Sequence, residues 1–135
     1  MEGEKGILLT NEVEVDRLIS CFYNEMPQGF EFSGEQHSGW EFVYVNSGNI
    51  CVEADNYTYI LKKGEMVCHK PFEFHTIKAY GGAASVIITC FESKSQSMEY
   101  FKKKIFAISS RQRLYFNDIA EASKSVFLPK SPLDI

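Results

Sequence analysis

The sequence is short of the features that mark membrane proteins and nucleic-acid-binding surfaces. Its longest nearly unbroken apolar run, residues 83–91, falls far short of the roughly 18 residues that a membrane-spanning helix needs. Basic residues are scattered, the formal net charge is -4, and the densest basic run is residues 102–104, so the footprint of a phosphate-binding surface is missing. The acidic start of the chain has no hydrophobic stretch after it, which argues against a secretory signal. We expect a cytoplasmic protein with no membrane partner and no affinity of its own for DNA.

Closely spaced cysteine pairs and nucleophile motifs are also absent. The cysteines lie far apart, each among apolar or aromatic neighbours, which predicts reduced, buried strand residues and not a disulfide network. They are Cys21, Cys51, Cys68 and Cys90. The sequence has no Gly-x-Ser-x-Gly elbow and no glycine-rich phosphate loop, so neither a nucleophilic hydrolase nor a nucleotide-binding protein is indicated.

What the sequence does contain is a succession of short β-type segments. Runs rich in Val, Ile, Tyr, Phe and Thr alternate with Gly, Asn, Asp and Pro as far as Phe91, a pattern typical of a β-sandwich or barrel. The predicted strands cover residues 15–23, 30–33, 40–47, 49–54, 57–62, 66–69, 75–79 and 85–91. Asp55 and Asn56 predict a tight hairpin because both tolerate positive φ, so strand 49–54 should fold back on strand 57–62.

After Phe91 the hydrophobic period changes to that of a helix. One apolar face is predicted at Met98, Phe101, Ile105 and Ile108, opposite the lysines of residues 102–104. A second face is predicted at Tyr115, Ile119, Ala122 and Val126, widened by Phe116, Ala120 and Phe127. Pro129 and Pro132 then end the helical pattern. The architecture expected from the pattern is a β-barrel followed by a helical pair.

Histidines and carboxylates gather in two of the predicted strands. Glu35, His37 and Glu41 share one face of an extended segment. Glu73 and His75 likewise share a face, so the two groups converge if their strands are neighbours. Three interpretations stay open: a divalent metal site, a self-satisfied buried polar network, or the polar part of a small-molecule pocket. Nearby aromatic residues such as Trp40 and Tyr44 suit either core packing or stacking on a ligand.

The order and spacing of these residues resemble a known family. GEQHSGWEFVYVNSG at 34–48 looks like the first cupin motif, and LKKGEMVCHKPFEFH at 61–75 looks like a shortened second motif. Together with ITCFESKSQSMEYFKKKIF at 88–106, they resemble the sensor domain of AraC-like transcription regulators from low-GC Gram-positive bacteria. The sequence departs from typical metal cupins at Glu35, where the first histidine of a closely spaced pair would stand, and at Glu73, near the usual glycine of the second motif.

The resemblance implies a fold and a function. The fold is mainly β: a cupin (double-stranded β-helix, jelly-roll) barrel followed by a C-terminal helical pair. Residues 1–93 would form the sensor barrel, residues 94–128 a helical dimerisation region packed on it, and residues 129–135 a linker-like tail. Because so few residues follow Phe127, the helix-turn-helix DNA-binding part of such a regulator would be missing from an excised or naturally fragmentary chain.

On this resemblance the chain is a homodimeric, non-enzymatic domain that binds a small-molecule effector, a sugar or another small metabolite, and controls DNA binding through the missing domain. The pocket is expected at Glu35, His37, Trp40, Glu41, Tyr44, Glu73 and His75. The dimer interface is expected at Met98, Phe101, Ile105, Ile108, Tyr115, Ile119 and Ala122. No resident cofactor is required. The alternative is a stand-alone metal-dependent cupin enzyme, an isomerase or dioxygenase, that holds zinc, iron, nickel or manganese at His37, Glu41 and His75.

Overall fold

Short runs of β-branched and aromatic residues form nine strands in the computed structural model, which describes residues 13–126. In chain order the strands are β1 (Arg17–Met26), β2 (Glu31–Glu35), β3 (Trp40–Ser47), β4 (Asn49–Ala54), β5 (Tyr57–Lys62), β6 (Glu65–His69), β7 (His75–Ala79), β8 (Ala84–Glu92) and β9 (Ile105–Ala107). Two helices follow the barrel strands: the 3-10 helix η1 (Gln96–Phe101) and the α-helix α1 (Ser110–Ser123). All eight predicted strands are present.

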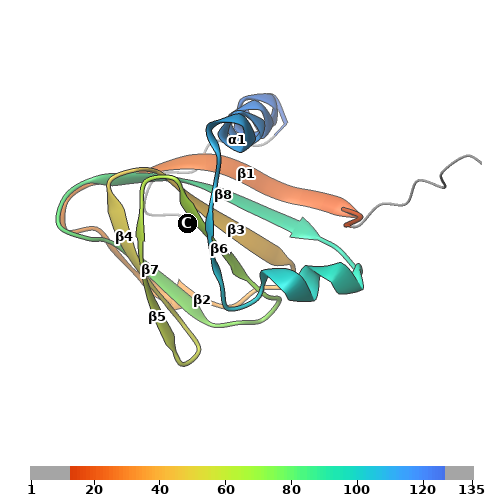
Figure 1. The fold of residues 1–135 in the computed structure, drawn as a ribbon, viewed down its shortest axis with the longest axis horizontal. Helices are drawn as coiled ribbons and strands as arrows, with labels where there is room; N and C mark the ends of the chain where they lie inside the picture. The colour runs from red at the N-terminus through yellow and green to blue at the C-terminus, as the bar shows by residue number, and fades with distance from the viewer. Residues whose placement is uncertain (1–12, 127–135) are drawn as a thin grey trace, which may run out of the picture.

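The strands form two antiparallel sheets that face each other as in a jelly roll (Figure 1). The five-stranded sheet has the order β1-β8-β3-β6-β9, and the four-stranded sheet has the order β2-β7-β4-β5. The predicted hairpin is confirmed, because β4 pairs with β5 from Asn49↔Lys62 to Ala54↔Tyr57 and Asp55 has a φ of 51°. Alternate residues of each strand point inward. The core between the sheets includes Val43, Val45, Val52, Leu61, Val67, Ile77 and Val86.

The expected first helix is wrong. Residues 96–101 form only the short helix η1, Lys103 has a φ of 55°, and Ile105–Ala107 is the strand β9. The physical reason is the open edge of β6, whose backbone groups need partners that β9 provides. Met98 is fully buried against Trp40, Cys68 and Phe91, so it cannot contact another chain. Ile105 is exposed on β9.

The second predicted helix is present as α1, which lies outside the five-stranded sheet beside β1 (Figure 1). A capping box begins it: Ser109 Oγ accepts a hydrogen bond from the Gln112 N–H at 3.1 Å, and Gln112 Oε1 accepts from the Ser109 N–H at 3.0 Å. Phe116 and Ala120 pack on the sheet, whereas the predicted face at Tyr115, Ile119, Ala122 and Val126 is exposed. Phe127 and the tail at 129–135 lie outside the described residues.

The cysteines are free thiols, as expected. Cys21, Cys51 and Cys68 are buried, and Cys90 is half-buried. No helix in residues 13–126 is long and apolar enough to cross a bilayer.

Gly48, the last residue of the first cupin-like motif, offers a test of this packing. Its φ is 73°, and an added Cβ would meet the Ala83 carbonyl oxygen and lie 2.8 Å from the Ala84 Cα. Gly64 has a similar φ of 89° but open space around it. We expect Gly64→Ala to lower the free energy of unfolding by about 1–2 kcal/mol through backbone strain alone, and Gly48→Ala by roughly 2 kcal/mol more through overpacking. Urea unfolding measures both, and equal losses would contradict the close approach of the Gly48 backbone to residues 83 and 84.

Candidate functional site

A cluster of charged side chains closes one end of the barrel interior. Glu41 is the second residue of β3. Its side chain shares the inward face of this strand with Val43 and Val45. Strand register brings the other groups to it: Glu35, at the end of β2, pairs with His75, at the start of β7, while Glu41 lies between its partners His69 on β6 and Cys90 on β8. The two polar stretches therefore converge in the structure, as the sequence predicts.

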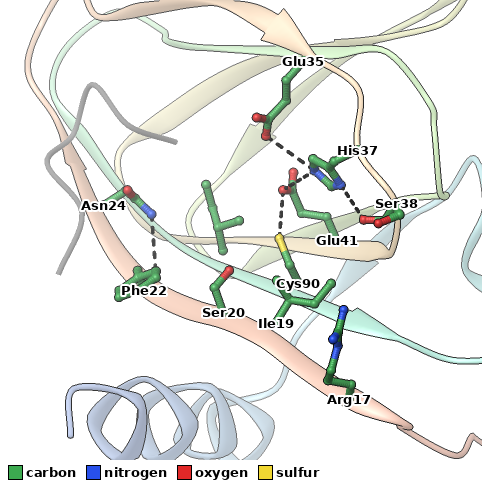
Figure 2. A pocket seen from close by; sticks show the side chains of 11 residues that line it. Arg17, Ile19, Ser20, Phe22, Asn24, Glu35, His37, Ser38, Glu41 and Cys90 are labelled. Atoms are coloured by element: carbon green, nitrogen blue, oxygen red, sulfur yellow. Dashed lines mark hydrogen bonds and ion pairs between the residues drawn. The ribbon is translucent and has the colours of Figure 1, made fainter. Parts of the chain in front are cut away.

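Four of these residues bring one ligand-type atom each within 4.8 Å of the others: Glu35, His37, Glu41 and His75. His37 Nε2 lies 3.4 Å from Glu35 Oε1 and 3.2 Å from Glu41 Oε1. His75 Nε2 lies 3.0 Å from Glu41 Oε2 and 3.6 Å from Glu35 Oε1. Figure 2 shows Glu35, His37 and Glu41 pointing toward one another. The geometry is that of two imidazole nitrogens facing two carboxylates.

Backbone carbonyls fix the orientation of both imidazoles. His37 Nδ1 donates to the Ser38 carbonyl oxygen at 3.0 Å, and His75 Nδ1 donates to the Glu73 carbonyl oxygen at 2.8 Å. Since a carbonyl oxygen only accepts, Nδ1 carries the hydrogen in each ring, and Nε2 of a neutral ring presents its lone pair to the cluster. Metal-binding histidines are held in this way.

The His75 Nε2 atom tests whether a metal fits here. It is buried and has no hydrogen-bond partner among residues 13–126, although Glu41 Oε2 lies 3.0 Å away as an ion-pair partner. Buried nitrogens without a partner are rare and costly. A divalent first-row ion among Glu35, His37, Glu41 and His75 would use this atom, and two imidazoles with two carboxylates are a donor set that such ions accept. The residues fit a metal.

Without a metal the cluster is held by ion pairs. Hydrogen bonds to Glu35 and Glu41 raise the pKa of His37 to about 10. Burial by itself would lower the pKa of His75, but the same two carboxylates raise it to about 10. Burial would raise the pKa of Glu35, yet the neighbouring His37 and His75 rings lower it to about 2, and the pKa of buried Glu41 is lowered for the same reasons. Two imidazolium groups thus balance two carboxylates.

His69 is a member of the cluster that sequence reasoning missed. Its ring stacks on His75 with centroids 4.1 Å apart and an interplanar angle of 10°, and its Nδ1 lies 3.2 Å from Glu73 Oε1. All three histidines of the chain therefore gather at this end of the barrel. Strand alternation in β6 could have predicted this position, because His69 shares the inward face with the core residue Val67. The Glu73 carboxylate pairs with His69 and does not belong to the four-residue group.

The structure does not bring Trp40 and Tyr44 to this cluster. Both lie on the outer face of β3, opposite Glu41. The Trp40 indole donates to the Ser93 carbonyl oxygen at 3.3 Å, and Tyr44 stacks on Phe116 of α1 with ring centroids 5.1 Å apart. These two aromatic residues hold the helical region on the barrel.

A pocket of about 340 Å³ opens beside the cluster (Figure 2). Glu35, His37 and Glu41 line one side, and the inner face of β1 lines the other with Ser20, Phe22 and Asn24. No pocket residue is predicted on β1 from the sequence, although its polar residues Ser20 and Asn24 point inward. The remaining lining residues are Arg17, Ile19, Ser38, Ile88 and Cys90. Its size lies within the range of small-molecule sites.

Asn24 is the most constrained polar side chain of this wall. It is only 3% exposed, its Nδ2 donates to the Phe22 carbonyl oxygen at 3.4 Å, and its Oδ1 has no hydrogen-bond partner among the described residues. The Cys90 thiol on the neighbouring strand donates to Glu41 Oε1 at 3.2 Å. The pocket therefore joins a charged end to an uncharged polar end.

Comparisons with solved structures agree with this fold. ToxT from Vibrio cholerae, solved with a bound unsaturated fatty acid, has a TM-score of 0.57 at 10% identity and covers 84% of this chain and 49% of its own. The DMSP lyase DddQ from Ruegeria pomeroyi has a TM-score of 0.51 at 18% identity, covering 53% and 37%. The cupin domain of Schizosaccharomyces pombe Cnp3 has 0.50 at 20% identity, covering 64% and 61%. This chain spans less than two thirds of each of these structures.

Sequence comparison gives the family directly. No curated protein sequence matches the chain. The family model described as "Cupin domain" matches residues 22–91, which contain the whole of β2 to β7 and all the members of the charged cluster. The match covers more than half of the sequence, and the two-sheet barrel is the fold expected of it. The chain belongs to the cupin family.

Proposed function

We propose that this chain is the effector-binding and dimer-forming domain of an AraC-like transcription regulator, and that a divalent metal ion organises its pocket. The convergence of His37 and His75 Nε2 with Glu35 and Glu41, beside a pocket of about 340 Å³, carries the proposal. The metal would supply a Lewis-acidic point that holds an oxygen or nitrogen atom of the effector. The protein's own residues orient the ligand atoms and surround the effector.

The regulator assignment rests on the sequence resemblance and on ToxT, an AraC-family protein. The likeness to ToxT extends over 84% of this chain, whereas that to the lyase DddQ covers 53%. A protein of net charge -4 whose basic residues are scattered along the sequence needs another domain to bind DNA. An effector that prefers one arrangement of barrel and helix would shift that domain by its differential affinity.

A metal-dependent cupin enzyme is the second candidate, and the four-residue donor set favours it. Solved relatives in fold include a lyase as well as ToxT. The two candidates differ in what happens to the bound molecule. A sensor releases its effector unchanged, whereas an enzyme gives a product that mass spectrometry detects after incubation.

The exposed face of α1 supports dimerisation. Tyr115, Ile119 and Ala122 are spaced by four and three residues, the seam spacing of paired helices. Val126 follows four residues later, in the turn after the helix, and none of the four is buried in the monomer. An apolar groove of about 440 Å³ between α1 and β1 adjoins this stripe and includes Tyr115 and Ile119. We assign the stripe to contact with the same stripe of a second copy, as in a two-fold dimer.

Metal analysis tests the centre of the proposal. After dialysis against zinc and then metal-free buffer, we expect about one zinc ion per chain, because the four candidate ligand atoms lie together in one group. His37→Gln should weaken zinc binding by roughly 100-fold or more, since even outer residues of such sites change affinity by 10- to 100-fold. Glu31→Gln, an exposed change on β2, is the control and should bind zinc normally. A wild-type protein without bound metal would refute the site.

The pH dependence of metal binding follows from the histidine pKa values. With His37 and His75 protonated up to about pH 10 in the folded, metal-free protein, each bound ion displaces two protons. The association constant should therefore rise by close to two decades per pH unit between about pH 6.5 and 8.5, a window below both raised pKa values. Competition with a chromophoric chelator measures it. A flat profile would contradict the protonation of both histidines in the metal-free protein.

The oligomeric state tests the stripe on α1. We expect sedimentation equilibrium to give a dimer for the wild type and a monomer for Ile119→Glu, because a buried carboxylate at an apolar seam is costly. Ser110→Glu places the same charge on an exposed position of the same helix, outside the stripe, and should remain dimeric. A monomeric wild type, or a dimeric Ile119→Glu protein, would contradict this interface.

A further inference from the structure

Glu35 gives the pocket a charge balance that selects its ligand. We infer that Glu35 makes this a site for an uncharged, hydroxyl-bearing molecule and excludes small carboxylates from the metal. The inference rests on the proposed metal site and goes beyond it by naming the class of ligand and the residue that sets it.

The carboxylates around the metal set its net charge. Glu35 and Glu41 together carry two negative charges, and the two histidines bind a metal as neutral rings. A divalent ion in this set is fully neutralised, whereas a set with one carboxylate would keep one positive charge. A negatively charged ligand gains little attraction from a neutral centre and meets the carboxylate of Glu35 at short range. A hydroxyl group has no such penalty.

The rest of the pocket adds little positive charge. Among its described lining residues, Arg17 is the one side chain with a permanent positive charge. Arg17 forms an ion pair with Glu92 at 2.6 Å, and its side chain is 68% exposed, so water and its partner screen it. Ser20, Ser38 and Asn24 are polar and uncharged. Nothing in the described lining replaces the positive charge that Glu35 removes.

The β1 side of the pocket has an unmet hydrogen-bonding requirement. Asn24 lines the pocket, and its buried Oδ1 has no hydrogen-bond partner in the part of the chain that the structure describes. A hydroxyl group can donate to such an oxygen, and an ionised carboxylate cannot. Phe22 and Ile88 beside it provide apolar surface for a carbon skeleton. The two ends of the pocket therefore favour the same chemical class: metal-facing hydroxyls at one end and a donating hydroxyl at the other.

The experiment compares two replacements of Glu35 in the full chain loaded with cobalt(II). Glu35→His keeps a metal-binding side chain and removes one negative charge, and Glu35→Asp keeps the charge. The probes are acetate, a small carboxylate, and erythritol, an uncharged polyol, each titrated while the visible cobalt spectrum is recorded. We expect the affinity ratio of erythritol to acetate to fall by about tenfold or more in Glu35→His, and to stay within about threefold of wild type in Glu35→Asp because the charge is kept.

Each other outcome is decisive. If cobalt binds but acetate perturbs the wild-type spectrum as strongly as that of Glu35→His, the charge inference is wrong and the metal site stands. If acetate binding disappears in Arg17→Gln while the cobalt spectrum stays unchanged, the anion binds Arg17 and the inference is again wrong. If no variant, wild type included, binds cobalt, both the proposed metal site and the inference fall.

Discussion

The carboxylate of Glu41 is the constraint on which this end of the molecule depends. Strand alternation points it into the barrel interior, on the same face of β3 as Val43 and Val45. An uncompensated charge is very costly there. His37, His75 and the Cys90 thiol surround it, and Glu35 completes the balance. Either two protons or one divalent ion can supply the required positive charge.

The same strands serve both the pocket and the helix. Along β1, Ser20, Phe22 and Asn24 face the pocket, whereas Cys21 and Tyr23 face α1, with the Tyr23 hydroxyl donating to Asn117. In the proposed sensor, a ligand that moves β1 therefore acts on α1 through one layer of structure. This arrangement provides a physical connection between the effector site and the dimer stripe.

The sequence predicted the barrel well because strand period and turn residues are local signals. The four-residue cluster was also within reach, since Glu35, His37, Glu41 and His75 follow from alternation and a single assumption about neighbouring strands. β9 was not predictable, because it depends on the open edge of β6, a tertiary feature. Trp40 and Tyr44 were assigned to the pocket through closeness in sequence, although their own alternation with Glu41 places them on the other face of β3. The role of β1 as pocket wall, with Ser20 and Asn24, required the register of β1 on β8.

Anomalous diffraction from crystals of the metal-loaded protein, recorded at the absorption edge of the metal, tests the metal site most directly. We expect a single strong peak among Glu35, His37, Glu41 and His75, with both Nε2 atoms about 2.0–2.1 Å from it. Absence of a peak, with His37 and His75 still paired to the two carboxylates, would contradict the central claim and leave a self-satisfied polar network at the end of the barrel.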